Sequence, residues 1–306
     1  MITFISLYIK KHKMKQFLSD AGNGMKIFYL LLFSFMGLLI AISFLALFSS
    51  IFGLTSVTDV WYIRISSILQ EVFVFLIPAY IVAMLSDKKP FKLMEMHGGE
   101  KLASGIILGI VLFCLAYPFI SYVTQWNMKI EFPDAFKNVE TWMRNMEDAA
   151  KQTTDQLLAG NNLGDFGLNI LLIAGLAALS EEIFFRGALQ TLLNKAFNNG
   201  HAAVWVSAII FSSIHFQFYG FFARLLMGAI LGYLFLYSKN LWVPIIVHFF
   251  NNAMVIITNQ FWGENEWTTE IDSKLTSIPL AVSSLIITIL AFIYFRKQQD
   301  STIKKL

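Results

Sequence analysis

The chain has 306 residues, of which 57% are hydrophobic and only 14% are charged. Soluble domains average about 45–50% apolar and about 25% charged residues, so this sequence lacks the polar material to cover a water-soluble fold of its length. The composition also excludes intrinsic disorder, and the single cysteine excludes a disulfide scaffold and a cysteine-based structural zinc site. A net charge of +3 without a basic stripe gives no indication of a nucleic-acid partner. A polytopic membrane protein remains.

Eight apolar stretches follow one another along the chain. A helix that spans a bilayer needs about 20 predominantly apolar residues. The sequence therefore predicts an all-α fold with about eight membrane-spanning helices, over residues 27–54, 63–85, 102–123, 166–193, 202–218, 221–237, 241–262 and 278–295. The fifth and sixth stretches are short, so a re-entrant or strongly tilted arrangement is an alternative for them.

The charges between the stretches predict the orientation. Lys and Arg collect in cytoplasmic loops. Basic residues gather in the N-terminal tail, in the loop 88–101, at Lys239 and in the C-terminal tail, and eight spans place all four regions on one side. The more acidic stretches 125–163 and 263–277 fall on the other side. We therefore expect both termini in the cytoplasm. The first apolar run is too long for a signal peptide, whose apolar region has about 7–15 residues, and is expected to be a true span.

The stretch 132–160 is the one sizeable polar insertion. Its apolar residues follow helical spacing, which predicts an amphipathic helix on the outer face: Phe136, Val139, Trp142, Met143 and Met146. Two interpretations stay open for this helix. It is either a solvated connection or a lid over an active site.

The fourth stretch carries charges where they are costly, because an ionisable group within a span costs about 2.5–3.5 kcal/mol. Glu182 and Arg186 are four residues apart, so they share a helix face and can pair. Glu181 points about 100° away from Glu182 and is free to face a cavity. A carboxylate in such a place suits a general acid or base. The alternative is an ion pair that only packs helices.

Two further stretches carry histidines. His215 lies near the end of the fifth stretch, and a histidine can be a ligand, a base or an oxyanion donor. His248 and Asn252 are four residues apart in the seventh stretch and share a face. Pro244 is expected to free or kink the backbone just before them. Hydrogen bonding between helices is the alternative for these side chains.

Three other ionisable residues lie within or beside spans. Arg64 and Arg224 are near span ends, so we expect both to extend to the membrane surface. Glu71 lies deeper and has no evident partner in the sequence. It is a candidate for supporting the site.

Together, Glu181, His215, His248 and Asn252 predict a polar cavity within the membrane that hydrolyses a bond with an activated water. In one version Glu181, His215 and His248 hold Zn²⁺, which lowers the pKa of its water to about 7. In the other version no metal is present. Glu181 with His215 then deprotonates water, while His248 with Asn252 stabilises the oxyanion. The residue types alone do not choose between the two.

The motifs Glu181-Glu182-x-x-x-Arg186, Phe211-x-x-x-His215 and His248-x-x-x-Asn252 resemble the three signature motifs of the CPBP family. These are the CAAX-protease and bacteriocin-processing intramembrane endopeptidases, related to the type II CAAX prenyl endopeptidases. The connecting sequence of residues 228–233 and 241–245 is also similar to that of the family. The matching region runs from about residue 170 to 258, which is under a third of the chain.

The resemblance implies peptide-bond hydrolysis in a cavity open to the membrane, with a membrane-associated or lipidated peptide as substrate and membrane lipid as partner. It implies that Glu181 activates water with His215, that His248 and Asn252 stabilise the oxyanion, and that Glu182 and Arg186 support the site. The family is often labelled metalloprotease, although a metal-free glutamate mechanism is argued for its eukaryotic relatives, so Zn²⁺ is expected only if the enzyme needs a metal. The family's distribution implies a bacterial inner membrane.

The chain accordingly divides into helices with a basic tail and an outer helix at 1–165, a catalytic core at 166–262, and a last helix with a basic tail at 263–306. Two other functions stay open. One is a non-catalytic membrane scaffold or bacteriocin self-immunity protein on the same fold. The other is a transporter, which would show inverted repeats that this sequence lacks.

Overall fold

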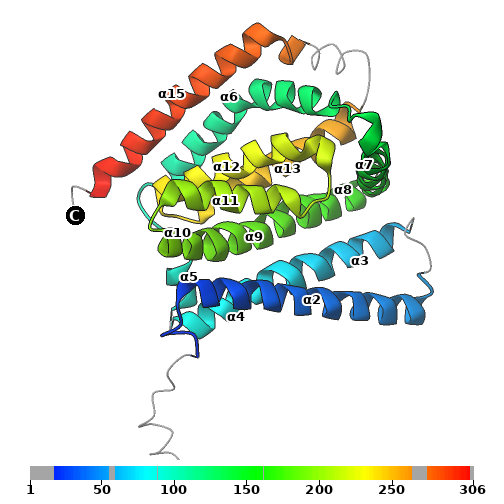
Figure 1. The fold of residues 1–306 in the computed structure, drawn as a ribbon, viewed down its shortest axis with the longest axis horizontal. Coiled ribbons are helices and arrows are strands. Elements are labelled where there is room, and N and C mark those ends of the chain that lie inside the picture. The colour runs from blue at the N-terminus through cyan, green and yellow to red at the C-terminus, as the bar shows by residue number, and fades with distance from the viewer. Residues whose placement is uncertain (1–16, 55–58, 88, 161, 264–273, 304–306) are drawn as a thin grey trace, which may run out of the picture.

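The computed structural model describes residues 17–54, 59–87, 89–160, 162–263 and 274–303. The basic residues of the N-terminal tail before residue 17 and the acids expected in the stretch 263–277 lie outside the described residues. All regular structure in the described part is helical, as Figure 1 shows. This confirms the predicted all-α class.

Seven helical stretches are long and apolar enough to cross a membrane, and one shorter apolar helix accompanies them. Together they account for the eight predicted stretches. In chain order they are α2 (Asn23–Phe52); α3 (Val60–Gln70) continued by η1 (Glu71–Leu76) and α4 (Ile77–Ser86); α6 (Leu102–Met128); α8 (Leu163–Asn169), η3 (Ile170–Leu176), α9 (Ala177–Glu182), η4 (Ile183–Gln190) and α10 (Thr191–Phe197); the shorter α11 (Gly200–Ser213); α12 (Phe221–Ser238); α13 (Trp242–Phe261); and α15 (Ile278–Ile303).

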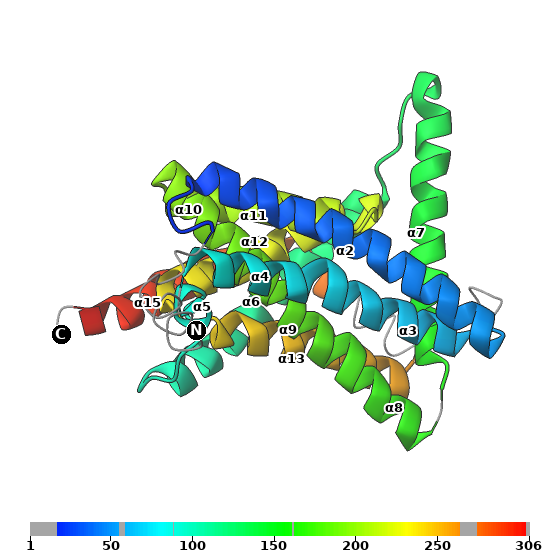
Figure 2. The ribbon, with the colours of Figure 1, turned by 90° about the horizontal axis from the view of Figure 1, so that it is seen from below.

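Short elements and one long polar helix connect these spans. The short ones are α5 (Pro90–Leu93), η2 (Asp134–Phe136) and η5 (Phe218–Gly220), and the long one is α7 (Lys137–Leu158). α7 confirms the helix predicted in the polar insertion. It lies across one end of the bundle, roughly at right angles to its neighbours, as Figure 2 shows. We call this end the α7 end.

The opposite end of the bundle holds the start of α2, the short α5, α10 and the end of α15 (Figures 1 and 2). The sequence predicted that four basic regions face the cytoplasm. The basic residues of these regions that the structure describes belong to these elements and to the loops beside them. The basic helix ends and α7 thus lie at opposite ends of the bundle.

Small residues let the central helices approach one another closely. A Cβ on Gly109 would lie 2.9 Å from a methyl carbon of Val247, so α6 packs directly on α13. A Cβ on Gly228 would lie 3.2 Å from the Cβ of Ala208, so α12 packs directly on α11. These contacts join α6 to α13 and α12 to α11, which are helices that position the site.

Three segments of the spans have the wide turns of a π-helix: η1, η3 and η4. Wide turns of this kind are frequent at functional sites, because they shift side chains out of the regular helical order. Two of them flank α9, the short helix that carries Glu181 and Glu182. The local irregularity therefore falls where the sequence places its buried charges.

Two features of the spans were not expected from the sequence. Arg64 is 3% exposed and donates to Asp165 Oδ1 at 2.7 Å, so it is paired within the protein. Asp165 is 101 residues away, so spacing within one helix cannot reveal this pair. Pro244 does not kink α13, because it lies in the first turn of that helix. The N–H groups of a first turn have no partner within the helix, so a proline is tolerated there.

Candidate active site

A cavity of about 280 Å³ lies among α9, α11, α12 and α13. Its wall includes all four residues predicted to be catalytic: Glu181, His215, His248 and Asn252. Three motifs that are far apart in the sequence therefore meet in one place. Their chemical roles stay a prediction.

A buried network fixes the orientation of His248. Arg186 donates to Glu182 Oε1 at 2.6 Å, as the spacing of the two residues predicted, and also to the carbonyl oxygen of Gly228 at 2.8 Å. Glu182 is fully buried, and its Oε1 lies 2.9 Å from His248 Nδ1. A carboxylate paired with arginine accepts hydrogen bonds, so Nδ1 of His248 carries the proton. Nε2 is then the ring nitrogen left for the cavity.

Glu181 is the carboxylate that faces the cavity. Its Oε2 lies 3.9 Å from His248 Nε2, which is too long for a hydrogen bond. A water molecule beside the two atoms can therefore bond to both. Arg186 is engaged by Glu182, as expected for the residue that lies on the same helix face. The division between one paired and one cavity-facing glutamate follows the sequence prediction.

His215 lies in the turn after α11, where Phe216 adopts a left-handed conformation with φ of 52°. His215 Nδ1 is 2.7 Å from the carbonyl oxygen of Phe211 and donates to it, because a carbonyl only accepts. Its Nε2 is thereby left for the cavity. The Phe211 ring contacts both imidazoles, with centroid distances of 5.0 Å to His215 and 6.2 Å to His248. In the described residues no ion pair joins His215 to Glu181.

Asn252 lies one turn after His248 and completes the cavity wall on α13. Its Nδ2 donates to the carbonyl oxygen of Ile173 at 3.2 Å, and its Oδ1 accepts from Asn251 at 3.0 Å. These bonds fix the plane of the amide. One N–H of the amide is left beyond the bond to Ile173, since an Asn side chain has two.

The turn that carries His215 is not helical, so its backbone groups need partners at this depth. Arg224 of α12 donates to the carbonyl oxygen of Gln217, and Asn127 of α6 donates to that of Phe218 at 3.1 Å. Glu147 of α7 accepts from the N–H of Tyr219 at 3.0 Å. Arg224 also lines the cavity, and its extension to the membrane surface stays a prediction. Side chains of α6, α7 and α12 therefore fix the segment that carries His215 and leads into α12.

The cavity runs toward the α7 end. Along α13 its wall extends from His248 to Ile256, which is about 12 Å at 1.5 Å per residue. Glu181 and His248 lie at its inner part, whereas Thr154 and Leu158 of α7 line it as well. Leu158 packs with Ile256. The final turn of α7 thus lies over the cavity, as the lid interpretation of this helix requires.

The remainder of α7 is anchored beside the cavity by charges and rings. Arg144 and Lys137 donate to Glu140 and hold the pKa of that carboxyl below its usual range. The guanidinium of Arg144 lies 4.4 Å from the centre of the Tyr219 ring. These contacts, with the Glu147 bond, connect α7 to the turn of His215.

Glu71 has a partner, Ser180, that could not be identified from the sequence. Ser180 Oγ donates to Glu71 Oε2, and Ser180 directly precedes Glu181 in the chain. Glu71 is 7% exposed and begins the wide-turn segment η1. It therefore supports, from behind the cavity, the helix that carries Glu181.

A metal site was the second version of the predicted chemistry. Among the described residues no three His, Cys, Asp or Glu side chains come together closely enough to hold a metal ion. Both imidazoles leave Nε2 for the cavity, as a ligand histidine does, but Glu181 has only one of them, His248, as an ion-pair neighbour. The side chains as arranged do not fit a three-ligand zinc site of Glu181, His215 and His248.

Three residues that sequence reasoning did not assign to the site contribute to it: Asn127, Glu147 and Thr154. They come from the part of the chain before the first motif, where no pattern marks them. A polar residue near the apolar end of a span, as Asn127 is, was the one available signal.

Residues 164–254 match the family described as Type II CAAX prenyl endopeptidase Rce1-like. The uncharacterized protein YpbD of Bacillus subtilis (strain 168) is 30% identical over 90 residues, which cover 28% of this chain and 43% of that protein. No solved structure matches the chain. The chain thus spans less than half the length of this curated relative. The predicted resemblance is confirmed over the region that contains the three motifs, and it supports, at family level, an intramembrane protease of the CAAX type.

Proposed function

We propose that the protein is an intramembrane endopeptidase that hydrolyses peptide bonds of membrane-associated or lipidated peptides with a water activated by Glu181. The observation that carries this proposal is the single cavity lined by Glu181, His215, His248 and Asn252. The family match over residues 164–254 supports it. The first 163 residues lie outside that match, so it carries no information about their part in substrate choice.

In the proposed reaction the water bonds to Glu181 Oε2, which lies 3.9 Å from His248 Nε2. His215, whose Nδ1 is engaged by Phe211, offers Nε2 to the same cavity and accepts a hydrogen bond from this water. As the water oxygen bonds to the carbonyl carbon, Glu181 takes a proton from it. The protonated Glu181 then delivers this proton to the amine nitrogen as the C–N bond breaks.

The negative charge develops on the former carbonyl oxygen, and we assign its stabilisation to His248 and Asn252. In this role His248 donates from Nε2 to the oxyanion while its Nδ1 donates to Glu182 Oε1. The free N–H of Asn252 is the second donor. Fixed donors of this kind need no rearrangement during the reaction, which is why they lower its barrier. Glu182 and Arg186 position His248.

We further propose that the protein lies in a bacterial inner membrane with both termini in the cytoplasm. The basic elements at one end of the bundle, around α5 and the ends of α2 and α15, support this orientation (Figure 1). The helix α7, and the part of the cavity that it covers, would then face the outer side.

The proposal is tested with the purified full chain in lipid nanodiscs and a panel of lipidated and unlipidated membrane peptides. We expect the wild type to cleave members of the panel. Glu181→Gln, which keeps the size of the side chain and removes the base, should lower the rate by about 10²–10⁴-fold. Products are identified by mass spectrometry.

The matched control is Glu100→Gln, which changes an exposed glutamate in the loop before α6 and should cleave as the wild type does. Thermal unfolding of each variant shows whether the fold is kept. Equal cleavage by Glu181→Gln and the wild type would refute the assignment of the base. Absence of any cleavage by a folded wild type across the panel would favour the non-catalytic scaffold.

A further inference from the structure

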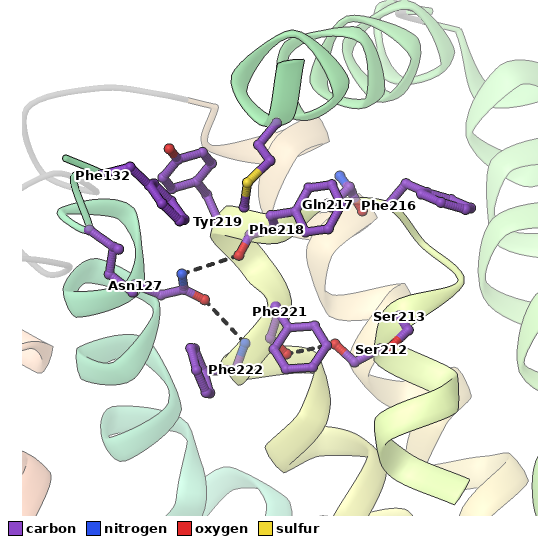
Figure 3. Close-up of a pocket in the computed structure, with 12 residues that line it drawn as sticks. Asn127, Phe132, Ser212, Ser213, Phe216, Gln217, Phe218, Tyr219, Phe221 and Phe222 are labelled. Carbon is purple, nitrogen blue, oxygen red and sulfur yellow. Dashed lines mark hydrogen bonds between the residues drawn. The ribbon is translucent and has the colours of Figure 1, made fainter. Parts of the chain in front are cut away.

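A second pocket lies beside the catalytic cavity and has a different character. It has a volume of about 470 Å³, which is within the range of about 300–1,000 Å³ for small-molecule sites. Aromatic rings line it from the α6–α7 connection, the turn after α11, η5 and the start of α12 (Figure 3). The sulfur-containing side chain of Met143 on α7 closes one side. The ring-bearing residues that line it are Phe132, Phe216, Phe218, Tyr219, Phe221 and Phe222.

Three of the polar side chains in this wall are already engaged by the protein. Asn127 donates to the carbonyl oxygen of Phe218 and accepts from the N–H of Phe222, both at 3.1 Å (Figure 3). Ser212 donates to the carbonyl oxygen of Phe221, and Ser213 to that of Ile209, both at 2.7 Å. These groups hold the surrounding backbone. The surface offered to a ligand is therefore mainly aromatic and aliphatic, which suits an apolar group.

One buried polar atom in the same wall has no partner within the described part of the chain. It is the hydroxyl of Tyr219, a residue that is 5% exposed. A buried polar group without a hydrogen bond costs free energy that a ligand can recover by bonding to it. A peptide backbone has carbonyl and N–H groups that can bond to this hydroxyl, whereas a hydrocarbon chain has none. The wall therefore favours a peptide, whose backbone bonds to Tyr219 while an apolar side chain fills the pocket, over a lipid chain.

The pocket and the catalytic cavity share one wall, which is the turn after α11. Ser213 and Phe216 line the pocket, and His215 between them lines the catalytic cavity. Helix α7 contributes to both, through Met143 to the pocket and through Thr154 and Leu158 to the cavity. A peptide whose backbone passes His215 under α7 can thus place a neighbouring side chain in the pocket.

We propose that this aromatic pocket is a substrate subsite that takes one bulky apolar side chain of the peptide, close to the bond that is cleaved. The inference rests on the proposed endopeptidase function and adds a specificity determinant to it. Met143 sets the depth of the subsite, because it enters from α7 and is the flexible member of the wall. Phe132 and Phe222 form the sides on which the substrate side chain packs.

The test uses full-length protein in nanodiscs and a peptide library in which one position at a time is varied among Ala, Leu, Phe and Trp. We expect one position, at a fixed distance from the cleaved bond, to prefer Leu or Phe over Ala by tenfold or more. Met143→Trp fills the subsite and should reverse this preference by about 10–200-fold, the range for a mismatch in an apolar pocket. Cleavage of peptides with Ala at that position should change little.

The matched control is Met146→Trp, which adds the same bulk to an exposed methionine one turn along α7 and should leave the preference as in the wild type. Equal effects of both tryptophan variants would overturn the subsite, because the change would then concern α7 as a whole. A wild type that cleaves without preference at any position would also overturn it.

A binding experiment separates this inference from the proposed function. Glu181→Gln protein is irradiated with peptides that carry p-benzoyl-phenylalanine at the preferred position, or at each position in turn if none is cleaved, and the labelled residues are mapped. If the pocket residues are labelled, and if Met143→Trp abolishes this labelling, the subsite is upheld even where the wild type cleaves nothing. Labelling confined to other surfaces would overturn it even if cleavage occurred, and so would labelling of the pocket by a photoreactive phospholipid but by no peptide.

Discussion

The buried pair of Glu182 and Arg186 provides the sharpest test of how the site is held together. Arg186 is 1% exposed, and its two hydrogen bonds are 2.6 Å to Glu182 and 2.8 Å to the carbonyl oxygen of Gly228. Arg186→Met keeps most of the side-chain length and leaves the Glu182 carboxylate buried without its cation. Removing one partner of a buried ion pair costs about 3–5 kcal/mol. We expect a loss of stability of this size.

The double variant Glu182→Gln with Arg186→Met should be more stable than Arg186→Met alone by about 1–3 kcal/mol, the usual range for two coupled residues. The reason is that no uncompensated charge is left, while the amide oxygen of Gln still accepts from His248. Unfolding in mixed micelles titrated with dodecyl sulfate, followed by fluorescence of the seven tryptophans, measures both values.

The control is Arg144→Met, which removes an arginine from a pair with the same spacing on α7, where Arg144 is 45% exposed. It should destabilise the protein less than Arg186→Met, since Lys137 still pairs with Glu140 at 3.2 Å. The reasoning would be refuted if the double variant lost the sum of the two single losses. The pair would then act as two independent contacts, and His248 would not depend on their joint charge.

Three further predictions concern the chemistry and the packing of the site. Asn252→Ala should lower kcat by about 10²–10³-fold with little change in KM in peptide-cleavage kinetics, because it removes an oxyanion donor, and a proportional rise in KM alone would contradict that role. Chelators should leave cleavage unchanged, since the side chains do not fit a three-ligand metal site; loss of activity that Zn²⁺ restores would show that the catalytic arrangement differs from the one described. Gly228→Ala should lower the unfolding midpoint, because its Cβ would lie 3.2 Å from Ala208 and Phe211, whereas Gly167→Ala, with no atom within 4 Å, should not, and equal effects would argue against close packing of α11 on α12.

Much of the fold could be predicted because membrane spans are local features of the sequence. Each apolar stretch predicts its own helix, and the structure contains a helix for each of them. The pairing of Glu182 with Arg186 was predictable for the same reason, since both residues belong to one helix face. The ends of the helices were predicted less accurately than their existence. α11 ends at Ser213, five residues before the predicted end, where the chain turns at His215.

The features that could not be predicted depend on residues distant in sequence. Arg64 pairs with Asp165, and Glu71 with Ser180, across separate spans. Neither partner is implied by periodicity, because periodicity describes one helix at a time. The partners of the turn after α11 follow the same pattern. Glu147 meets Tyr219 from a connecting helix whose path no local signal specifies.

The most direct test of the central claim is hydrolysis in water enriched in ¹⁸O. The wild type is given a panel peptide that it cleaves, and it should place one ¹⁸O atom in the new C-terminal carboxylate within a single turnover. Glu181→Gln should yield no product above background. That result would show that the new carboxylate takes its oxygen from water and that the reaction depends on Glu181. Product that forms without ¹⁸O, or at an equal rate in Glu181→Gln, would contradict the claim.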